Sequence, residues 1–373
     1  MNISHVISTM QFGGAQNIAL GLAEEAVHSG HNASIISVCK GNDYCSRLNN
    51  YNVTCCSLEY TGNFRPYNII QITKLRSRLI RYIKMVQPDL IHVHLFIPKI
   101  LLYGMSGVSG IPVIQTQHDN SPWWFKRNMN SRLKTHIEKK MAKITARYTV
   151  AISESVKHDM VKYLRLNENK IRVINNFIDT SFIGKENPGK KNPAGKLYMI
   201  TRLDIEKKGL DTALSIIKAV KEKMPDSTLT LIGDGPGKHR LSSMIQESGL
   251  ENIVHINGYT ENVSGNLSDA DIVLMPSRWE GFGLTAAEAA AMGVPVVASR
   301  VGGLQDVVID GKTGFTCEPE DVNAFAECIV TLLKDKKLYT SISKQAKELA
   351  LKRFDRKKAF LQYETLYRKI LNG

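Results

Sequence analysis

Long apolar runs are missing from this sequence of 373 residues. A helix that crosses a bilayer needs about 20 mainly apolar residues, and the longest candidate, residues 97–114, is interrupted by Pro98, Lys99 and Pro112. The first residues, MNISHVIST, have the composition of a β-strand and lack the basic start and apolar centre of a signal peptide. We therefore expect a protein that does not span a membrane and carries no signal peptide.

Cysteine is scarce, and acidic residues are scarce in one half. The six cysteines include one adjacent pair, Cys55 and Cys56, but no spacing typical of metal ligands or of a disulfide framework. We interpret them as reduced thiols in a cytoplasmic protein. Residues 1–186 hold 23 Lys and Arg against 12 Asp and Glu, whereas residues 187–373 hold 26 against 23. The first half is therefore expected to face an anionic partner.

Segments with strand composition alternate with amphipathic segments along the whole chain. The predicted strands are residues 4–8, 33–38, 90–93, 113–116 and 149–152, and then 197–201, 228–232, 253–257, 272–275 and 296–298. This alternation predicts an α/β protein with two Rossmann-like, doubly wound parallel-sheet domains. The expected bounds are 1–184 for the N-terminal domain, 185–195 for a linker, 196–354 for the C-terminal domain and 355–373 for a final helix.

One strand, turn and helix in the second half has the form of an anion site. Residues 272–275 are predicted as a buried strand, a sharp turn follows at Gly281 and Gly283, and an Ala-rich helix begins at Leu284 and ends before Gly293. In a parallel sheet such a helix begins at the carboxyl edge of the strands, where free N–H groups and the helix dipole attract anions. The sequence therefore predicts a phosphate site at this helix start.

Two glutamates flank this turn, Glu280 before it and Glu288 about one turn inside the helix. The helix dipole alone can explain an acid at Glu288, whereas Glu280 has no capping role. The stretch EGFGLTAAE resembles the E-x7-E signature of the retaining, nucleotide-sugar-dependent glycosyltransferases of family 4. The resemblance implies the GT-B fold, in which two Rossmann-like domains face each other across a cleft and the final helix packs back on the first domain.

The resemblance also assigns roles to residues that match the family's motifs. It implies that Arg202 and Lys208 hold the diphosphate of a nucleotide diphospho-sugar, that Glu288 binds the ribose and that Glu280 orients the sugar. His118, just past a predicted strand, would contact the donor sugar, although a lone histidine is more often a structural hydrogen-bonding group. The other donor-binding residues implied are Gly13, Gly14, Gly233, Gly235, Phe282, Gly283, Leu284 and Thr285.

The motifs depart from the family pattern at three places and include one misleading match. Gln16 replaces a usual Glu near the acceptor, Phe177 a usual Gly and Thr201 another Gly. Asp269 and Asp271 match the D-x-D with which other glycosyltransferases hold a metal, but here they only begin the strand that leads to Glu280. We therefore expect no metal and no cofactor apart from the nucleotide-sugar co-substrate.

A basic segment with aromatic residues follows His118. Its membrane or acceptor candidates are Trp123, Trp124, Lys126, Arg127, Lys139, Lys140 and Lys143, and Glu138 is its only acid. Such a segment resembles an interfacial membrane site, and a solvated helix face is the alternative. We expect a cytoplasmic enzyme that is peripheral on the inner face of the cell membrane.

The sequence thus predicts a retaining, metal-independent glycosyltransferase. It would move a hexose or N-acetylhexosamine from a nucleotide diphospho-sugar to a lipid-linked or soluble glycan, in the synthesis of a bacterial-type surface polysaccharide, O-antigen, lipopolysaccharide or capsule. A UDP-sugar is the favoured donor, and GDP-mannose is the alternative. A GT-B sugar-nucleotide epimerase and a non-catalytic partner subunit are the alternatives. The sequence has no recognised nucleic-acid-binding motif.

Overall fold

The chain forms two compact units, residues 1–177 with 356–373 and residues 178–355. The computed structural model describes residues 1–11, 13–41, 48, 51–62, 64, 68–103, 110–120, 122–124, 128–144, 146–179 and 193–372. The first unit ends before the predicted bound of 184, because the amide of Ile178 donates to the carbonyl oxygen of Phe354 in the second unit at 3.0 Å. The predicted linker, 185–195, lies outside the described residues except for 193–195.

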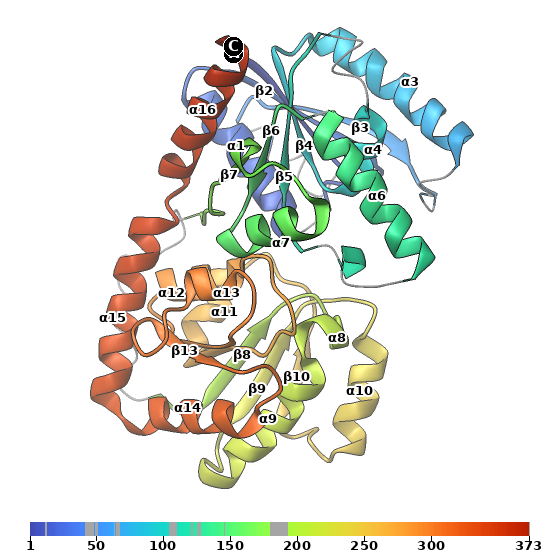
Figure 1. Cartoon of the computed structure of the whole chain (residues 1–373). Helices are drawn as coiled ribbons and strands as arrows, with labels where there is room; N and C mark the ends of the chain where they lie inside the picture. Colours follow the sequence, from blue (N-terminus) through green and yellow to red (C-terminus); the bar gives the residue numbers. More distant parts are fainter. Residues whose placement is uncertain are drawn as a thin grey trace. The chain divides into compact units, whose positions relative to one another are not determined.

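The first unit contains a parallel sheet with the strand order β3-β2-β1-β4-β5-β6-β7 (Figure 1). The strands are β1 (Asn2–Ile7), β2 (Asn32–Cys39), β3 (Thr54–Tyr60), β4 (Leu90–His94), β5 (Val113–Gln117), β6 (Tyr148–Ala151) and β7 (Ile171–Val173). The strand order reverses between β1 and β4, and ligands of open α/β sheets bind outside the carboxyl ends of the strands at such a point. His118 follows the carboxyl end of β5, the neighbour of β4.

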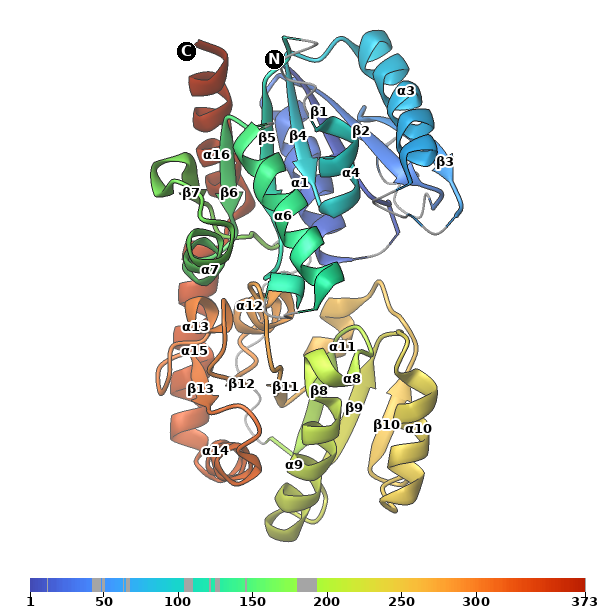
Figure 2. The same ribbon diagram turned by 45° about the vertical axis from the view of Figure 1, so that its right-hand side comes forward.

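Helices cover both faces of this sheet. They are α1 (Gly14–His28), α3 (Ile69–Val86), α4 (Phe96–Leu102), α6 (Met129–Ile144), α7 (Glu154–Leu164) and α16 (Arg356–Asn372), with the 3-10 segments η1 (Pro122–Trp124) and η2 (Glu168–Lys170). Figures 1 and 2 show α3, α4 and α6 in a row, and α4 contacts both of its neighbours. The last helix, α16, packs on α1 in this unit, and Arg147 donates to the carbonyl oxygen of Ile370 at 2.8 Å.

The second unit contains a parallel sheet with the order β10-β9-β8-β11-β12-β13. Its strands are β8 (Lys196–Ile200), β9 (Thr228–Ile232), β10 (Val254–Asn257), β11 (Ile272–Met275), β12 (Val296–Ser299) and β13 (Gly314–Cys317). Its helices are α8 (Ile205–Lys208), α9 (Leu210–Lys223), α10 (Lys238–Glu247), α11 (Val263–Asp269), α12 (Leu284–Ala291), α13 (Leu304–Val307), α14 (Val322–Lys334) and α15 (Lys336–Arg353). The order reverses between β8 and β11, which places the loops after these two strands at the expected ligand position.

Both sheets are parallel and doubly wound, which confirms the predicted fold class. The apolar strands predicted from the sequence form the buried centres of the sheets: Ile91 and Val93 lie in the core of the first unit, and Ile272 and Leu274 in that of the second. None of the helices in the described part of the chain has the length and apolar character needed to cross a bilayer.

Candidate functional site

The turn between β11 and α12 has the geometry that a phosphate site requires. Gly283, just before α12, has a left-handed backbone with φ 91°, and a Cβ atom there would lie 2.5 Å from Leu304. Within the described residues no side chain caps the start of α12. The first amides of this helix, those of Gly283, Leu284 and Thr285, can therefore bind an anion.

A second pair of glycines supports this turn from the loop after β12. A Cβ atom at Gly302 would lie 2.1 Å from the carbonyl oxygen of Glu280, and one at Gly303 would lie 2.1 Å from that of Gly281. The amide of Gly303 donates to the carbonyl oxygen of Glu280 at 3.0 Å. The backbones approach so closely that only glycine fits. The sequence analysis did not single out this pair, although a Gly-Gly in the loop after a predicted strand was a usable signal.

Two side chains of the predicted donor site have structural roles instead. The ring of Phe282 is 2% exposed and packs edge to face on Phe354, with 5.3 Å between the ring centroids. The side chain of Phe282 is therefore part of the core, and the predicted contact of this residue with the donor stays a prediction. The hydroxyl of Thr285 donates to the carbonyl oxygen of Ile200, the last residue of β8, at 2.9 Å. Thr285 thus ties α12 to β8 and offers a ligand its backbone amide.

Lys208 and Glu280 form an ion pair beside this turn. Nζ of Lys208 lies 2.5 Å from Oε2 of Glu280, and the two side chains are 15% and 13% exposed. Gly209 ends α8 with φ 61°, and a Cβ atom there would lie 2.0 Å from the carbonyl oxygen of Pro276. This glycine therefore lets the end of α8, which carries Lys208, approach the end of β11, which leads to Glu280.

The charges around Glu280 keep it ionised. Burial acts to raise the pKa of this carboxyl, but the ammonium groups of Lys208 and Lys207 and the Gly281 amide outweigh it, so the pKa lies below its usual value. Lys207, which the sequence analysis did not single out, is half-buried and contributes the second of these charges. Arg202, the other predicted diphosphate ligand, is exposed just after β8. The site thus combines one paired and one exposed cation with an uncapped helix start.

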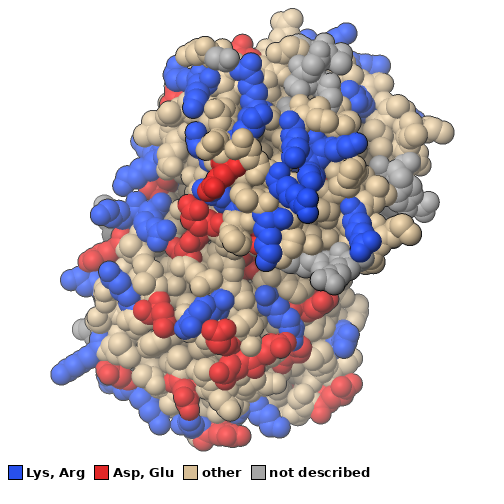
Figure 3. Space-filling model, in the orientation of Figure 1, with Lys and Arg blue, Asp and Glu red and all other residues tan. Residues whose placement is uncertain are grey.

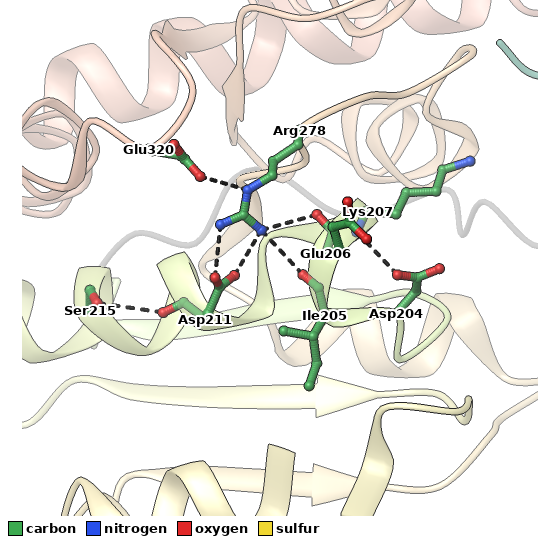
Figure 4. Close-up of polar contacts among 8 residues, drawn as sticks. All are labelled: Asp204, Ile205, Glu206, Lys207, Asp211, Ser215, Arg278 and Glu320. Atoms are coloured by element: carbon green, nitrogen blue, oxygen red, sulfur yellow. Dashed lines mark hydrogen bonds and ion pairs between the residues drawn. The ribbon is translucent and has the colours of Figure 1, made fainter. Parts of the chain in front are cut away.

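Arg278, which the sequence analysis missed, connects the two segments that carry this ion pair, helix α8 and the loop after β11 (Figure 4). Its Nη1 and Nη2 donate to the two carboxylate oxygens of Asp211 on α9 at 3.0 and 2.8 Å, and Nε donates to Glu320 at 2.6 Å. Nη1 also donates to the carbonyl oxygen of Glu206 in α8 at 3.0 Å. The planar guanidinium group holds its partners in a defined geometry and also supplies a positive charge. Arg278 therefore holds α8, with Lys208, against the loop that leads to Glu280.

Glu288 lies inside α12 in a half-buried position. Burial and then the nearby Asp179 carboxylate raise the pKa of Glu288 to about 7. A carboxyl held in this way is uncharged in a large share of molecules at neutral pH. Partners that donate hydrogen bonds, such as sugar hydroxyls, favour its charged form. The position therefore suits a ligand hydroxyl better than the simple helix-dipole role.

Gly233 and Gly235 allow two loops to pack closely. Gly233 follows β9 with φ 143°, and a Cβ atom there would lie 2.0 Å from the carbonyl oxygen of Thr201. A Cβ atom at Gly235 would lie 2.8 Å from the backbone N of Leu203. Both glycines thus bring the loop after β9 against the loop that carries Arg202. Their predicted contact with the donor stays a prediction.

The predicted residues of the first unit lie at the carboxyl edge of its sheet. Gly13 precedes α1, which begins at Gly14, and its backbone is extended (φ 172°), a conformation open to any residue. A Cβ atom at Gly13 would meet the side-chain oxygen of Gln16 at 2.5 Å, the end of a flexible side chain. Nε2 of His118 lies 2.8 Å from Nδ1 of His94 in a hydrogen bond. His118 is therefore part of a larger histidine cluster.

The two tryptophans of the basic segment form hydrogen bonds with a buried acid of the same segment. The indole N–H groups of Trp123 and Trp124 donate to Oε2 of Glu138 at 3.0 and 2.7 Å, and Trp124 is 6% exposed. Glu138 is buried and forms an ion pair with buried Lys99 at 3.5 Å. Trp124 is therefore corrected from an interfacial anchor to a core contact, because its indole N–H donates to the buried carboxylate of Glu138, the one acid of the segment. Lys126 and Arg127 lie outside the described residues.

The exposed basic surface of the first unit is formed by α6 and by α3, a helix that the sequence analysis did not single out. On α6, Lys140 and Lys143 are exposed and Lys139 is half-buried. α3 carries five basic residues and no acid, in the sequence IIQITKLRSRLIRYIKMV, and its Ile69 and Ile70 are 74% and 81% exposed. Figure 3 shows basic side chains over this unit with few acidic ones among them.

The carboxylates of the D-x-D match are used within the fold. Asp269 accepts hydrogen bonds from Lys196 at 2.8 Å and from the hydroxyl of Tyr198 at 2.7 Å. Asp271 is 1% exposed and accepts from the amides of Ala194 and Lys196 at 2.8 and 2.9 Å. These bonds lie at the amino end of β11, away from the carboxyl end that leads to Glu280.

Known proteins share both the sequence pattern and the fold. The model of "Glycosyltransferase Family 4" matches residues 12–182, and that of "Glycosyl transferases group 1" matches residues 183–349. The N-acetyl-alpha-D-glucosaminyl L-malate synthase of Bacillus anthracis is 28% identical over 320 residues, which are 83% of this chain and 81% of that protein.

Solved structures agree over almost the whole length. A sucrose-phosphate synthase from Thermosynechococcus elongatus has a TM-score of 0.85 at 21% identity and covers all of both chains. Anabaena HepE in complex with UDP and glucose has a TM-score of 0.81 at 22% identity and covers 98% of this chain and 99% of that one. The chain belongs to the glycosyltransferases of family 4 and has the GT-B fold. It is a glycosyltransferase.

Proposed function

We propose that this chain is a retaining, metal-independent glycosyltransferase that moves a hexose or N-acetylhexosamine from a nucleotide diphospho-sugar to a glycan acceptor. A UDP-sugar is the favoured donor, and GDP-mannose is the alternative. Support for UDP comes from the similar HepE structure, which holds UDP and glucose. The name of the Bacillus anthracis relative supports an N-acetylhexosamine.

The observation that carries this proposal is the Lys208–Glu280 pair, 2.5 Å apart beside the uncapped start of α12. In the ligand-free protein the two charges neutralise each other. When the donor binds, Lys208 would contact the diphosphate and Glu280 would accept hydrogen bonds from the sugar hydroxyls. Arg202 would add a second cation to the diphosphate.

During transfer the bond between the anomeric carbon and the diphosphate oxygen breaks, and a bond from an acceptor hydroxyl oxygen forms. The hydroxyl proton goes to the leaving phosphate, as the resemblance implies for this family. Negative charge grows on the leaving oxygen, so Lys208, Arg202 and the α12 amides bind the transition state more tightly than the ground state. These fixed groups would take the part that a metal plays elsewhere, and the D-x-D carboxylates already have partners within the fold.

A donor screen tests this proposal. Thermal shift would be measured with UDP-, GDP- and ADP-sugars, with and without EDTA, and the anomeric configuration of the product would be read by proton NMR. We expect one nucleotide class to raise the melting temperature equally in both conditions, and we expect a product with the anomeric configuration of the donor. A shift that disappears on chelation and returns with Mg²⁺, or an inverted product, would contradict the proposal.

The acceptor that fits the first unit is a glycan linked to a lipid at an anionic membrane, in the synthesis of a surface polysaccharide, O-antigen or capsule. The exposed surface of α3 and α6 carries many basic residues, and the one acid of these two helices, Glu138, is buried. Ile69 and Ile70 at the start of α3 and Met129 at the start of α6 are 74%, 81% and 85% exposed. Basic charge beside exposed apolar side chains favours the interface of an anionic bilayer. The enzyme would therefore be peripheral on the cytoplasmic face of the cell membrane.

Vesicle sedimentation tests this surface. Each basic residue near an anionic surface contributes about 1 kcal/mol, so a triple change of Lys139, Lys140 and Lys143 to Glu should weaken binding to vesicles with anionic lipid by more than about 100-fold. A matched triple change to Glu of Lys218, Lys221 and Lys223 of α9, of which two are exposed and one is half-buried, should leave binding unchanged. Equal binding of the wild type to neutral and anionic vesicles would contradict the assignment.

A further inference from the structure

Four histidines cluster beneath the predicted site of the first unit. His5 lies on β1, His92 and His94 lie on β4, and His118 follows β5, so they occupy three neighbouring strands. His5, His92 and His94 are fully buried. The ring centroids of His92 and His94 are 4.1 Å apart, and those of His94 and His118 are 5.1 Å apart. Of this cluster, only His118 is among the residues predicted to contact the donor sugar.

Three of the four histidines form a continuous hydrogen-bonded chain. Nδ1 of His5 lies 3.0 Å from Nε2 of His94, and Nδ1 of His94 lies 2.8 Å from Nε2 of His118. The two ends of this chain, Nε2 of His5 and Nδ1 of His118, are buried and have no hydrogen-bond partner within the described residues. Each end therefore carries a nitrogen that the fold itself does not satisfy.

The three rings are neutral. Burial lowers the pKa of His5 to about 3, and burial, then the Lys99 ammonium, lowers that of His118 to about 3. Burial also lowers the pKa of His94, and the adjoining His92 adds to this effect. A neutral imidazole carries one proton, so one of its nitrogens donates and the other accepts.

Two hydrogen bonds in series leave only two proton arrangements. In one, every Nδ1 carries the proton, and His118 presents Nδ1–H to a ligand. In the other, every Nε2 carries it, His118 presents a bare Nδ1, and Nε2–H of His5 is left buried without a partner. Each arrangement leaves one N–H without a partner, that of His118 Nδ1 in the first and that of His5 Nε2 in the second. His5 is 0% exposed on β1, whereas His118 is half-buried at the carboxyl edge of the sheet, so only the first arrangement places the N–H where a ligand can accept from it. The first arrangement is therefore favoured.

We propose that His5 and His94 are positioning residues that hold His118 as its Nδ1–H tautomer, so that His118 donates a hydrogen bond to an oxygen of the sugar substrate. The identity of this oxygen rests on the proposed glycosyl transfer, whereas the hydrogen-bonded chain does not. The chain sets both the ring orientation and the proton position of His118 from β1, two strands away. This resembles the way in which a buried partner fixes the tautomer of a catalytic histidine.

A metal site is the other chemistry that three adjacent histidines suggest. His5, His92 and His94 offer ligand atoms within 4.8 Å of one another. However, both nitrogens of His92 are already used, Nδ1 at 2.7 Å from the hydroxyl of Tyr367 and Nε2 at 2.7 Å from that of Thr116. The positive charge of Lys99 also acts on His94 and would repel a cation. The donor set therefore fits a proton-ordered chain better than a metal.

The tautomers are measurable on the ligand-free protein by two-bond ¹H–¹⁵N correlation of histidine side chains at pH 7. We expect the Nδ1–H pattern for His5, His94 and His118 in the full-length wild type, unchanged by added Zn²⁺. An Nε2–H pattern or a mixture at His118, or loss of these signals with one equivalent of Zn²⁺, would overturn the proposal. This measurement needs no substrate, so it is decided separately from the proposed enzymatic function.

Two variants of His5 and one of His92 link the chain to activity. His5→Asn keeps an N–H group near the Nδ1 position, whereas His5→Leu removes it. We expect His5→Leu to change the tautomer signature of His118 and to lower kcat/KM for the donor about tenfold, as the loss of one hydrogen bond does, and we expect His5→Asn to restore both. His92→Leu, equally buried but outside the chain, should lower stability and leave the His118 tautomer unchanged. Equal effects of His5→Leu and His92→Leu on that signature would refute the positioning role.

Discussion

Glu288 provides a quantitative test because its ionised form should favour donor binding but lower the stability of the ligand-free protein. Burial, then the Asp179 carboxylate, raises the pKa of Glu288 from its usual value of 4.5 to about 7 in the folded protein. Between these pH values the folded chain keeps a proton that the unfolded chain releases. The free energy of unfolding must therefore fall as pH rises from 4.5 to 7. The difference in pKa corresponds to about 3 kcal/mol.

The substitution Glu288→Gln removes this penalty, because the amide stays neutral. At pH 8 the ligand-free variant should be more stable than the wild type by up to about 3 kcal/mol, and at pH 4 the two should be equal. Urea unfolding at pH 4, 6 and 8 measures the difference, with Glu247→Gln, an exposed position on α10, as the control. A difference that does not change with pH, or a variant that is less stable at pH 8, would refute the reasoning.

Donor binding should show the reverse preference. If ribose hydroxyls donate to Glu288, binding requires the carboxylate, so the affinity of the wild type should fall below pH 7 by up to about tenfold per pH unit. The Gln variant should bind the donor more weakly than the wild type at pH 8, and its affinity should not depend on pH in this range. Its KM for the donor should be higher, with little change in kcat. Calorimetry should use the sugar nucleotide, because a free terminal phosphate titrates in the same range with a second pKa of about 6. A wild-type affinity that stays constant from pH 6 to 8 would contradict the ribose role.

Further predictions concern the cations of the second unit. Lys208→Ala should reduce transition-state stabilisation by about 2 to 4 kcal/mol and lower kcat accordingly. Lys207→Ala should lower kcat less. In steady-state kinetics, a rise in KM alone for Lys208→Ala would contradict the leaving-group role. Glu280→Gln should also act mainly on kcat, because the sugar changes its charge distribution in the transition state. Arg278→Lys keeps the positive charge but loses the planar guanidinium group, so it should reduce the free energy of unfolding by about 1 to 2 kcal/mol and lower kcat. An unchanged kcat in a folded variant would show that Arg278 does not position Lys208. Activity should persist in EDTA, measured as nucleoside diphosphate release, and recovery by added Mg²⁺ after a loss would refute metal independence.

The sequence predicted the centres of both sheets better than their edges. Strands that are buried on both faces are continuous apolar runs, as at residues 272–275, and such runs are easy to recognise. Three edge strands were missed: β3, Thr54–Tyr60, β7, Ile171–Val173, and β13, Gly314–Cys317. β7 has three residues and β13 begins with glycine, so neither of these two has a local signal, and both depend on pairing with a neighbouring strand.

The candidate site was predictable where its residues are near each other in sequence. The turn from Glu280 to Glu288 is one segment, so its motif was readable. Arg278 was missed because its partners Asp211 and Glu320 lie 67 and 42 residues away. The histidine chain depends on the register of β1, β4 and β5, which no local pattern specifies. The inward turn of Glu138 toward Trp124 is likewise a tertiary contact, and the basic composition around it indicated the opposite.

The central claim is that the second unit holds the diphosphate of a sugar nucleotide through Lys208 and Arg202 beside α12. The most direct measurement is the release of nucleoside diphosphate from the donor identified by the screen, with and without a membrane lipid extract as the source of acceptor. The account predicts release that requires the acceptor, occurs in the wild type and falls by about 30- to 900-fold in kcat for Lys208→Ala. Release without acceptor, or equal turnover of the wild type and the double variant Arg202→Ala, Lys208→Ala, would contradict it.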